Sequence, residues 1–154
     1  MSINNPNESS KTILIVASDE KTSAPFKEWF EQAGFSVDIA LDAIKAIEYV
    51  RENMYQLILI DCQLDEEFAG LDAYWLLKPY IPNNNVIMMS SVVDKRSINR
   101  VKSRGLHHLI HKSFEPDHTP YEIEKVLTDM EYSSSDRGSF HPIKNLFHRF
   151  FSNN

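Results

Sequence analysis

The stretch "TILIVASDE" (residues 12–20) is an apolar run that stops abruptly at small and acidic residues. An uninterrupted apolar run of this length is typical of a strand that is buried on both faces of a parallel sheet. The run therefore predicts a strand that brings Ala17, Ser18 and Asp19 to one edge of a sheet. Only one of these three residues carries a carboxylate.

Four similar apolar runs follow, and a segment with helical spacing comes after each run. Apolar residues at i, i+3, i+4 and i+7 mark one buried helix face. Five repeats of strand and helix predict an α/β fold, a five-stranded parallel sheet doubly wound by helices as in flavodoxin-like proteins. Proline is tolerated in the first turn of a helix, so Pro25 predicts that the first helix begins near Ser23 or Ala24. The later runs are "SVDIA" (36–40), "LILID" (57–61), "VIMMS" (86–90) and "HLI" (108–110).

Composition narrows the class of protein. The chain has 154 residues, of which 42% are hydrophobic and 25% charged, as expected for one soluble domain with short tails. A formal net charge of −6 disfavours nucleic acid as a partner. Cys62 is the single cysteine, which excludes an intrachain disulfide. With no apolar signal-like start and no run long enough to span a membrane, we expect a cytoplasmic protein.

Four regions are expected along the chain. Residues 1–10 are polar and predicted to be disordered, residues 11–130 form the α/β domain, and residues 131–139 read as a linker. Residues 140–154 form an amphipathic tail helix with two cations and no acid. Its apolar side chains fall at helical spacing and are Ile143, Leu146, Phe147, Phe150 and Phe151.

The tail has three interpretations. Five large apolar side chains are costly to leave in water, so the helix either packs on its own domain or docks in a groove of a partner protein. Weak membrane association is the third interpretation, and it is disfavoured because two cations give little attraction to a lipid surface.

Polar residues end three of the predicted strands. Asp61 closes the third strand, Ser90 closes the fourth, and Lys112 follows the fifth. The carboxyl ends of parallel strands share one edge of the sheet, where ligands bind. A carboxylate nucleophile, a hydroxyl that bonds a phosphoryl oxygen and an ammonium that neutralises charge would form a phosphoryl-accepting site.

These motifs resemble the receiver domain of bacterial response regulators in two-component signalling. "YQLILIDCQL" (55–64) places Asp61 at the phosphoacceptor position, "VIMMSS" (86–91) places Ser90 at the switch position, and "HKSF" (111–114) places Lys112 at the family lysine. The resemblance covers residues 11–130 and implies phosphorylation by a histidine kinase.

The departures from the family pattern point to a degenerate, or pseudo-receiver, domain. Receivers usually end the first strand with two adjacent acids that hold Mg²⁺, and here Ala17 and Ser18 stand at those positions, with Asp19 expected to point elsewhere. Leu109 replaces the usual aromatic switch residue, and Ser113 replaces the usual proline. The acidic loop 65–67 could still supply a substitute metal ligand from Glu66 or Glu67, although a solvated acidic loop is the simpler interpretation.

The sequence therefore predicts a stand-alone, non-enzymatic receiver that works through protein–protein contacts without phosphorylation and without a cofactor or metal. The 24 residues after Met130 are too few for a DNA-binding output domain. Partners would be signalling proteins such as a histidine kinase, docking on residues 94–130 and on the tail, and a homodimer stays open. The alternative is a working phosphoacceptor that uses Asp61 and Mg²⁺.

Overall fold

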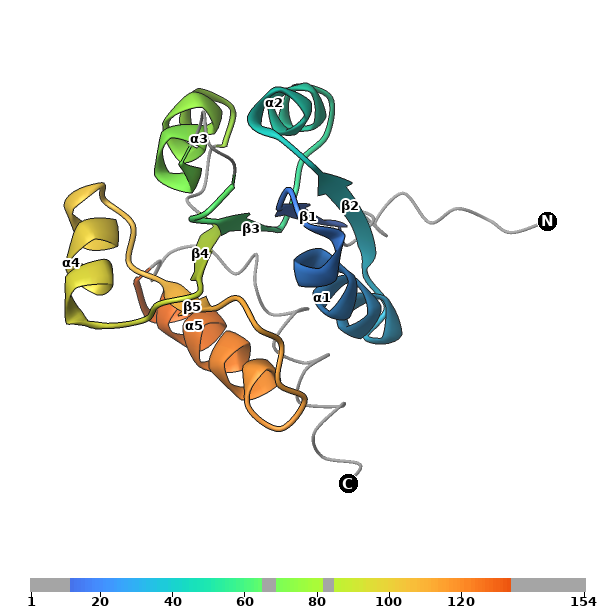
Figure 1. Ribbon diagram of the computed structural model, residues 1–154. Coiled ribbons are helices and arrows are strands. Elements are labelled where there is room, and N and C mark those ends of the chain that lie inside the picture. Colours follow the sequence, from blue (N-terminus) through green and yellow to red (C-terminus); the bar gives the residue numbers. More distant parts are fainter. Residues whose placement is uncertain (1–11, 65–68, 82–84, 134–154) are drawn as a thin grey trace.

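A computed structural model describes residues 12–64, 69–81 and 85–133 and shows five strands alternating with five α-helices (Figure 1). All strand pairs are parallel, and the strand order is β2-β1-β3-β4-β5. This topology confirms the predicted doubly wound α/β fold. The strands are β1 (Thr12–Val16), β2 (Ser36–Ala40), β3 (Leu57–Asp61), β4 (Val86–Ser90) and β5 (Leu109–His111). The helices are α1 (Glu20–Gln32), α2 (Ala43–Glu52), α3 (Gly70–Leu77), α4 (Lys95–Ser103) and α5 (Thr119–Ser133), with a short 3₁₀ helix η1 (Lys78–Tyr80) after α3.

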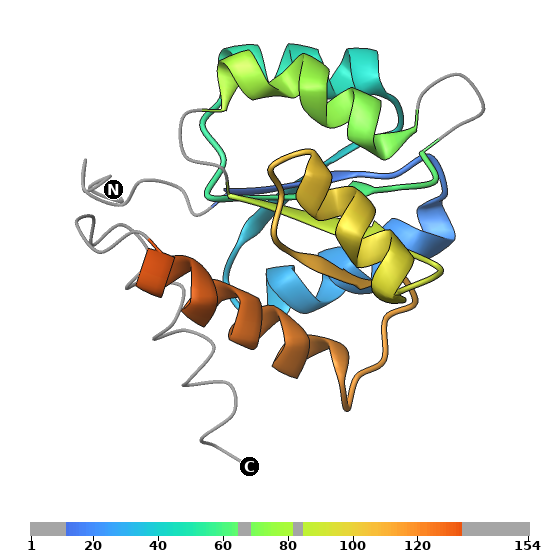
Figure 2. The ribbon, with the colours of Figure 1, turned by 90° about the vertical axis from the view of Figure 1, so that its left-hand side faces the viewer.

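The sheet separates two apolar layers. Helices α1 and α5 cover one face, and α2, α3 and α4 cover the other (Figures 1 and 2). Alternate residues of one strand enter opposite layers: Ile13 and Ile15 pack with α1 and α5, whereas Leu14 and Val16 pack with α2 and α3. The central strands β3 and β4 are buried along their whole length, which is why they read as continuous apolar runs.

Helix α1 begins earlier than the sequence suggested. The prediction of a start near Ser23 or Ala24 is wrong, because Asp19 caps the helix and Glu20 is its first residue. The Asp19 carboxylate accepts a hydrogen bond from the Lys21 N–H at 2.9 Å, which satisfies a donor that the first turn leaves free. Pro25 lies inside the helix, where it removes one backbone hydrogen bond, and burial of the apolar face around Phe26 offsets this loss.

Two further boundaries differ slightly from the sequence prediction. Strand β5 starts at Leu109, one residue later than predicted, so His108 precedes the strand. Helix α5 continues to Ser133, three residues beyond the predicted end of the domain at Met130. Residues 1–10, most of the predicted linker and the whole tail 140–154 lie outside the described residues.

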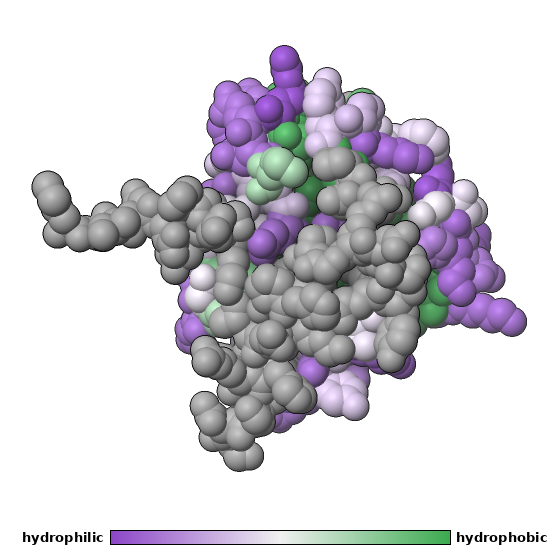
Figure 3. Space-filling view, turned by 180° about the vertical axis from the view of Figure 1, so that it is seen from behind, coloured by the Kyte–Doolittle hydropathy of each residue, from purple (hydrophilic) through white to green (hydrophobic). Residues whose placement is uncertain are grey.

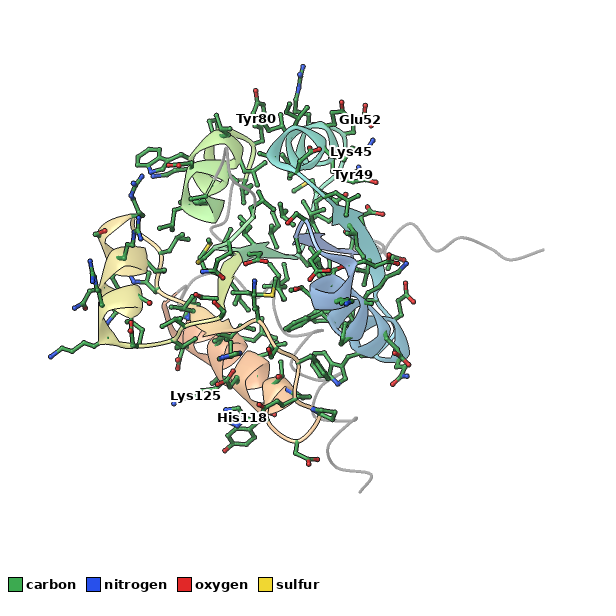
Figure 4. The ribbon with its side chains drawn as sticks, in the orientation of Figure 1. Lys45, Tyr49, Glu52, Tyr80, His118 and Lys125 are labelled. Atoms are coloured by element: carbon green, nitrogen blue, oxygen red, sulfur yellow. The ribbon has the colours of Figure 1, made fainter. Side chains whose placement is uncertain are left out.

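The outer surface carries charged pairs that are ordinary for a protein surface. On α2, Lys45 contacts Glu48 at 3.2 Å and lies over the ring of Tyr49 (Figure 4). His118, which directly precedes α5, contacts Glu122 of that helix at 2.9 Å. Water screens exposed pairs of this kind, so they add little stability and do not mark a site. The face seen from behind is mixed, with hydrophilic residues around small hydrophobic areas (Figure 3). No helix in the described part of the chain combines the length and the apolar character needed to cross a membrane.

Candidate functional site

Three neighbouring strands deliver polar side chains to one edge of the sheet. Asp61 ends β3, Ser90 ends β4, and Lys112 follows β5 directly. The Lys112 N–H donates to the Ser90 carbonyl at 2.9 Å, which extends the β4–β5 pairing to the last residue of the candidate site. The structure therefore brings together the three side chains that the sequence placed at a common edge.

Asp61 is almost fully enclosed, with 1% of its surface exposed. Its Oδ2 lies 3.5 Å from the Lys112 Nζ, and its Oδ1 accepts a hydrogen bond from the Gln63 N–H at 2.8 Å. A buried carboxylate is costly unless a cation and hydrogen-bond donors surround it. Lys112 and the Gln63 backbone supply both, so the charge of Asp61 is compensated within the domain.

Gln63 is a residue of the site that the sequence analysis missed. Its Nε2 donates to the Ser90 Oγ at 3.1 Å, and its Oε1 accepts from the Ser91 N–H at 3.1 Å. The same Ser90 Oγ also accepts a hydrogen bond from the Val92 N–H at 3.2 Å. Gln63 thus bridges the segments that leave β3 and β4, and it engages the Ser90 hydroxyl. Its position two residues after Asp61, at the same edge, was the available signal.

Gly70 shows how tightly the chain returns to the end of β3. A Cβ atom at this position would lie 2.0 Å from the Asp61 carbonyl oxygen. This oxygen belongs to the backbone and cannot move without displacing β3. The Gly70 N–H donates to the Cys62 carbonyl at 3.0 Å. Glycine is therefore required here by a close backbone approach rather than by a special φ angle.

The end of β1 is different in character. Ala17 is fully buried in the apolar layer beneath α1, while Ser18 is exposed. The Asp19 carboxylate caps α1 by accepting a hydrogen bond from the Lys21 N–H. None of these three residues adds a second carboxylate beside Asp61.

This donor set does not fit Mg²⁺, the metal that the receiver resemblance implies. Mg²⁺ prefers carboxylate oxygens in near-octahedral geometry. Across residues 12–64, 69–81 and 85–133, no group of three or more His, Cys, Asp and Glu side chains is close enough to hold a metal ion. Glu66 and Glu67, the alternative metal ligands considered from the sequence, lie outside the described residues.

Two neighbouring positions complete the edge. Cys62 is partly buried against the layer of α2, α3 and α4, and burial, together with the nearby Asp61 charge, raises the pKa of its thiol to about 11. A thiol with this pKa is protonated at neutral pH and is a poor nucleophile. Leu109, at the position of the usual aromatic switch residue, is partly buried against the same layer.

Comparison with known proteins identifies the family. The family described as "Response regulator receiver domain" matches residues 13–124. The transcriptional regulatory protein CrdR of Helicobacter pylori is 23% identical over 120 residues, which are 77% of this chain and 56% of the relative. The transcriptional regulatory protein ZraR of Klebsiella oxytoca is 27% identical over 125 residues, which are 80% of this chain and 28% of the relative. The chain thus spans about half or less of the length of these relatives.

Solved structures show the same fold. A response regulator from Thermotoga maritima superposes with a TM-score of 0.66 at 24% identity, covering 77% of this chain and 98% of the other. The chain belongs to the receiver domain family of response regulators and therefore to two-component signalling. Receiver domains are generally non-enzymatic modules that interact with kinases or other signalling proteins.

Proposed function

We propose that this receiver domain acts as a phosphorylation-independent protein-interaction module in two-component signalling. The observation that carries the proposal is the end of β1, where the buried Ala17 and the exposed Ser18 stand in place of two metal-binding acids. Phosphoryl transfer to a carboxylate needs strong compensation of the charge on the phosphoryl group. Lys112 supplies part of it, and the described residues offer no divalent metal site to supply the rest.

The hydrogen bonds of the Ser90 hydroxyl support the same proposal. Its hydroxyl oxygen already accepts hydrogen bonds from the Gln63 side chain and from the Val92 backbone. A phosphoryl group on Asp61 would have to displace the Gln63 contact before Ser90 could turn toward it. The interaction surface would therefore keep one conformation, and signalling would depend on the abundance or binding of the partner.

A direct test uses beryllofluoride, which mimics a phosphoryl group on a receiver aspartate. Amide NMR spectra of the ¹⁵N-labelled chain would be recorded with Mg²⁺, with and without beryllofluoride, for the wild type and for Asp61→Asn. We expect the amide signals of Asp61, Ser90 and Ser91 to stay in place in both proteins. Shifts in the wild type that are absent from Asp61→Asn would contradict the proposal.

A gain-of-function variant sharpens this test. Ser18→Asp, alone and combined with Ala17→Asp, returns carboxylates to the end of β1. We expect at least one of these variants to gain Mg²⁺-dependent thermal stabilisation, whereas the wild type shows none. A ligand present at about 10 times its dissociation constant stabilises a protein by about 1.4 kcal/mol, which a melting curve resolves. Equal stabilisation of the wild type would show that the native site already holds the ion.

The second candidate function is a working phosphoacceptor, in which a histidine kinase phosphorylates Asp61. The observation that favours it is the conjunction of Asp61, Lys112 and Ser90 within one edge, with the Asp61 and Lys112 side chains 3.5 Å apart. This function requires metal ligands from outside the described residues, such as Glu66 or Glu67. Incubation with acetyl phosphate and Mg²⁺, followed by phosphate-affinity electrophoresis, would detect the phosphorylated form.

A further inference from the structure

A hollow of about 140 Å³ lies between the start of α3 and one face of α4, next to Ser90 and Gln63. Helices α3 and α4 are neighbours on the same side of the sheet in both ribbon views (Figures 1 and 2). We call this hollow the α3–α4 groove. It is lined by Cys62, Gln63, Ala69, Leu71, Asp72, Ser90, Ser97, Arg100, Val101, Arg104 and Leu109.

The α4 wall of the groove is cationic. Ser97, Arg100, Val101 and Arg104 all line the groove, and their spacing of i, i+3, i+4 and i+7 places them on one face of the helix. Residues 95–104 contain five lysine or arginine residues and no acid, in a chain whose net charge is −6. Within the described residues, neither Arg100 nor Arg104 forms an ion pair. The two guanidinium groups are thus available to carboxylates of a partner.

The floor of the groove is apolar. Leu71 and Val101 are buried core residues, Leu109 is partly buried, and the Cys62 thiol is neutral at physiological pH. An engineered cavity of about 150 Å³ holds a benzene molecule, so a hollow of this size can accept one leucine or phenylalanine side chain. The floor therefore suits a single apolar anchor rather than a long hydrophobic helix.

The α3 wall adds one acid and an apolar margin. Among the lining residues that the structure describes, Asp72 is the only acidic side chain, against two arginines. Trp75 is 49% exposed and Leu76 is 42% exposed. They follow Asp72 by three and four residues, which places them along the same side of α3. Half-exposed aromatic residues beside a pocket are typical of interaction surfaces.

We propose that the α3–α4 groove binds an acidic segment of a partner protein, with one leucine or phenylalanine side chain in the hollow and flanking carboxylates on Arg100 and Arg104. This inference rests on the proposed function and specifies the chemistry of the partner. Arginine pairs with carboxylates through two parallel hydrogen bonds, which fixes the orientation of the bound segment. The arginines line the groove from α4, and Leu109 of β5 lies at its floor.

The test measures binding of a fluorescent synthetic peptide of about 12 residues, with one central phenylalanine flanked by aspartate and glutamate. Two control peptides replace the phenylalanine by alanine or the acids by lysines. We expect the acidic phenylalanine peptide to bind the full chain, and each control peptide to bind at least about tenfold more weakly. Absence of binding by the acidic phenylalanine peptide, or equal binding of all three peptides, would overturn the proposal.

Protein variants locate the site. Arg100→Glu combined with Arg104→Glu should weaken the acidic peptide by at least about tenfold. The matched control is Lys95→Glu combined with Lys102→Glu, which makes the same change in charge on the opposite side of α4 and should weaken binding by less than about threefold. Equal losses of peptide affinity in the two double variants would mean that only net charge matters, and this result would overturn the proposal that the peptide binds in the groove. Circular dichroism and melting curves establish that each variant is folded.

A third variant tests the hollow without changing the charge. Leu109→Phe fills the space next to Val101, and we expect it to remove the preference for phenylalanine over alanine in the peptide. An unchanged preference would mean that the anchor lies elsewhere. Binding that appears only after addition of Mg²⁺ and beryllofluoride would contradict phosphorylation independence while leaving the groove intact, so failure of the groove and failure of the proposed function give different results.

Discussion

The carboxyl ends of β1 and β3 lie side by side in the sheet but differ in almost every physical respect. At the end of β3, Asp61 is a buried charge with a cation at 3.5 Å and a backbone donor at 2.8 Å. At the end of β1, Ala17 belongs to the apolar core and Ser18 faces solvent. One half of the edge is a polar cluster whose charge is compensated, and the other half consists of a buried methyl group and an exposed hydroxyl.

The polar cluster at the end of β3 is held together without any contact from the end of β1 among the interactions described for Asp61 and Ser90. Asp61, Gln63, Ser90 and Lys112 satisfy one another through contacts among β3, β4, β5 and the segments that follow them. The half of the edge that holds Mg²⁺ in an ordinary receiver is therefore not needed to compensate the charge of Asp61. Similar effects of substitutions at the two strand ends would contradict this difference.

The largest effect is expected for Gly70→Ala. The new Cβ would collide with the Asp61 carbonyl, so the chain entering α3 must move away from the end of β3. Forcing atoms into a packed position costs about 1–3 kcal/mol and occasionally more, and because the obstacle is backbone we expect about 3 kcal/mol. Urea unfolding followed by circular dichroism measures the loss.

Gly34→Ala is the control for Gly70→Ala. Gly34 has a φ of +94°, and a Cβ added there would meet no atom within 4 Å, so alanine costs only about 1 kcal/mol through the backbone conformation. If Gly70→Ala lost no more unfolding free energy than Gly34→Ala, the backbone at the end of β3 would be able to move and accommodate the added Cβ.

The next effect compares the two members of the ion pair. Lys112→Met leaves Asp61 charged, buried and without its cation, and we expect a loss of about 2 kcal/mol because the lysine is partly solvated. Asp61→Asn keeps the shape and still accepts the hydrogen bond from Gln63, so its loss should stay below about 1 kcal/mol. Chemical unfolding at neutral pH would measure the loss of unfolding free energy in each variant. A larger loss for Asp61→Asn than for Lys112→Met would mean that the buried Asp61 charge does not depend on Lys112 for its compensation.

The sequence predicted those features that follow from repeated burial. Strands β1, β3 and β4 were located to within a residue because both of their faces are apolar, and the edge shared by Asp61, Ser90 and Lys112 follows from parallel topology. The start of α1 was predicted wrongly, because the local cap at Asp19 outweighed the positional preference of Pro25.

Other parts of the site could not be predicted because they depend on contacts between segments distant in the chain. Gln63 belongs to a polar segment without periodicity, and its contacts with Ser90 and Ser91 span 27 and 28 residues. The close approach of Gly70 to Asp61 likewise requires the path of the chain in space. The α3–α4 groove combines residues from α3, α4, β5 and the ends of two strands, a set that no single sequence pattern contains.

A smaller effect is expected for Gln63→Ala. Loss of its two side-chain hydrogen bonds, at a position that is largely exposed, should cost no more than about 1 kcal/mol. The structural effect should be local, with the largest amide shifts at Ser90, Ser91 and Val92. Ser18→Ala is the matched change at the end of β1, where an exposed hydroxyl is removed, and we expect little change in stability. If Ser18→Ala caused amide shifts as large as those of Gln63→Ala, the two strand ends would not differ in the way proposed here.

The smallest effect concerns the ionisation of Cys62. Burial raises the pKa of its thiol to about 11, so the folded state holds the proton more tightly than the unfolded chain, whose thiol has the ordinary value of 9.0. The stability that the neutral thiol provides is therefore complete below pH 9 and is lost as the pH rises from 9 toward 11. Relative to Cys62→Ala, we expect the wild type to lose less than about 1 kcal/mol of unfolding free energy between about pH 8 and about pH 10, since the thiol is only partly enclosed.

A cysteine at the other strand end provides the control for this pH dependence. In Ser18→Cys combined with Cys62→Ala, the new thiol replaces an exposed side chain and should titrate near its ordinary value in both the folded and the unfolded states. Its stability relative to Cys62→Ala should then not change with pH. Urea unfolding of the three proteins across this range measures both differences. If the two cysteines gave the same pH dependence, the end of β3 would be no more enclosed than the end of β1, and the physical contrast between the two halves of the edge would be lost.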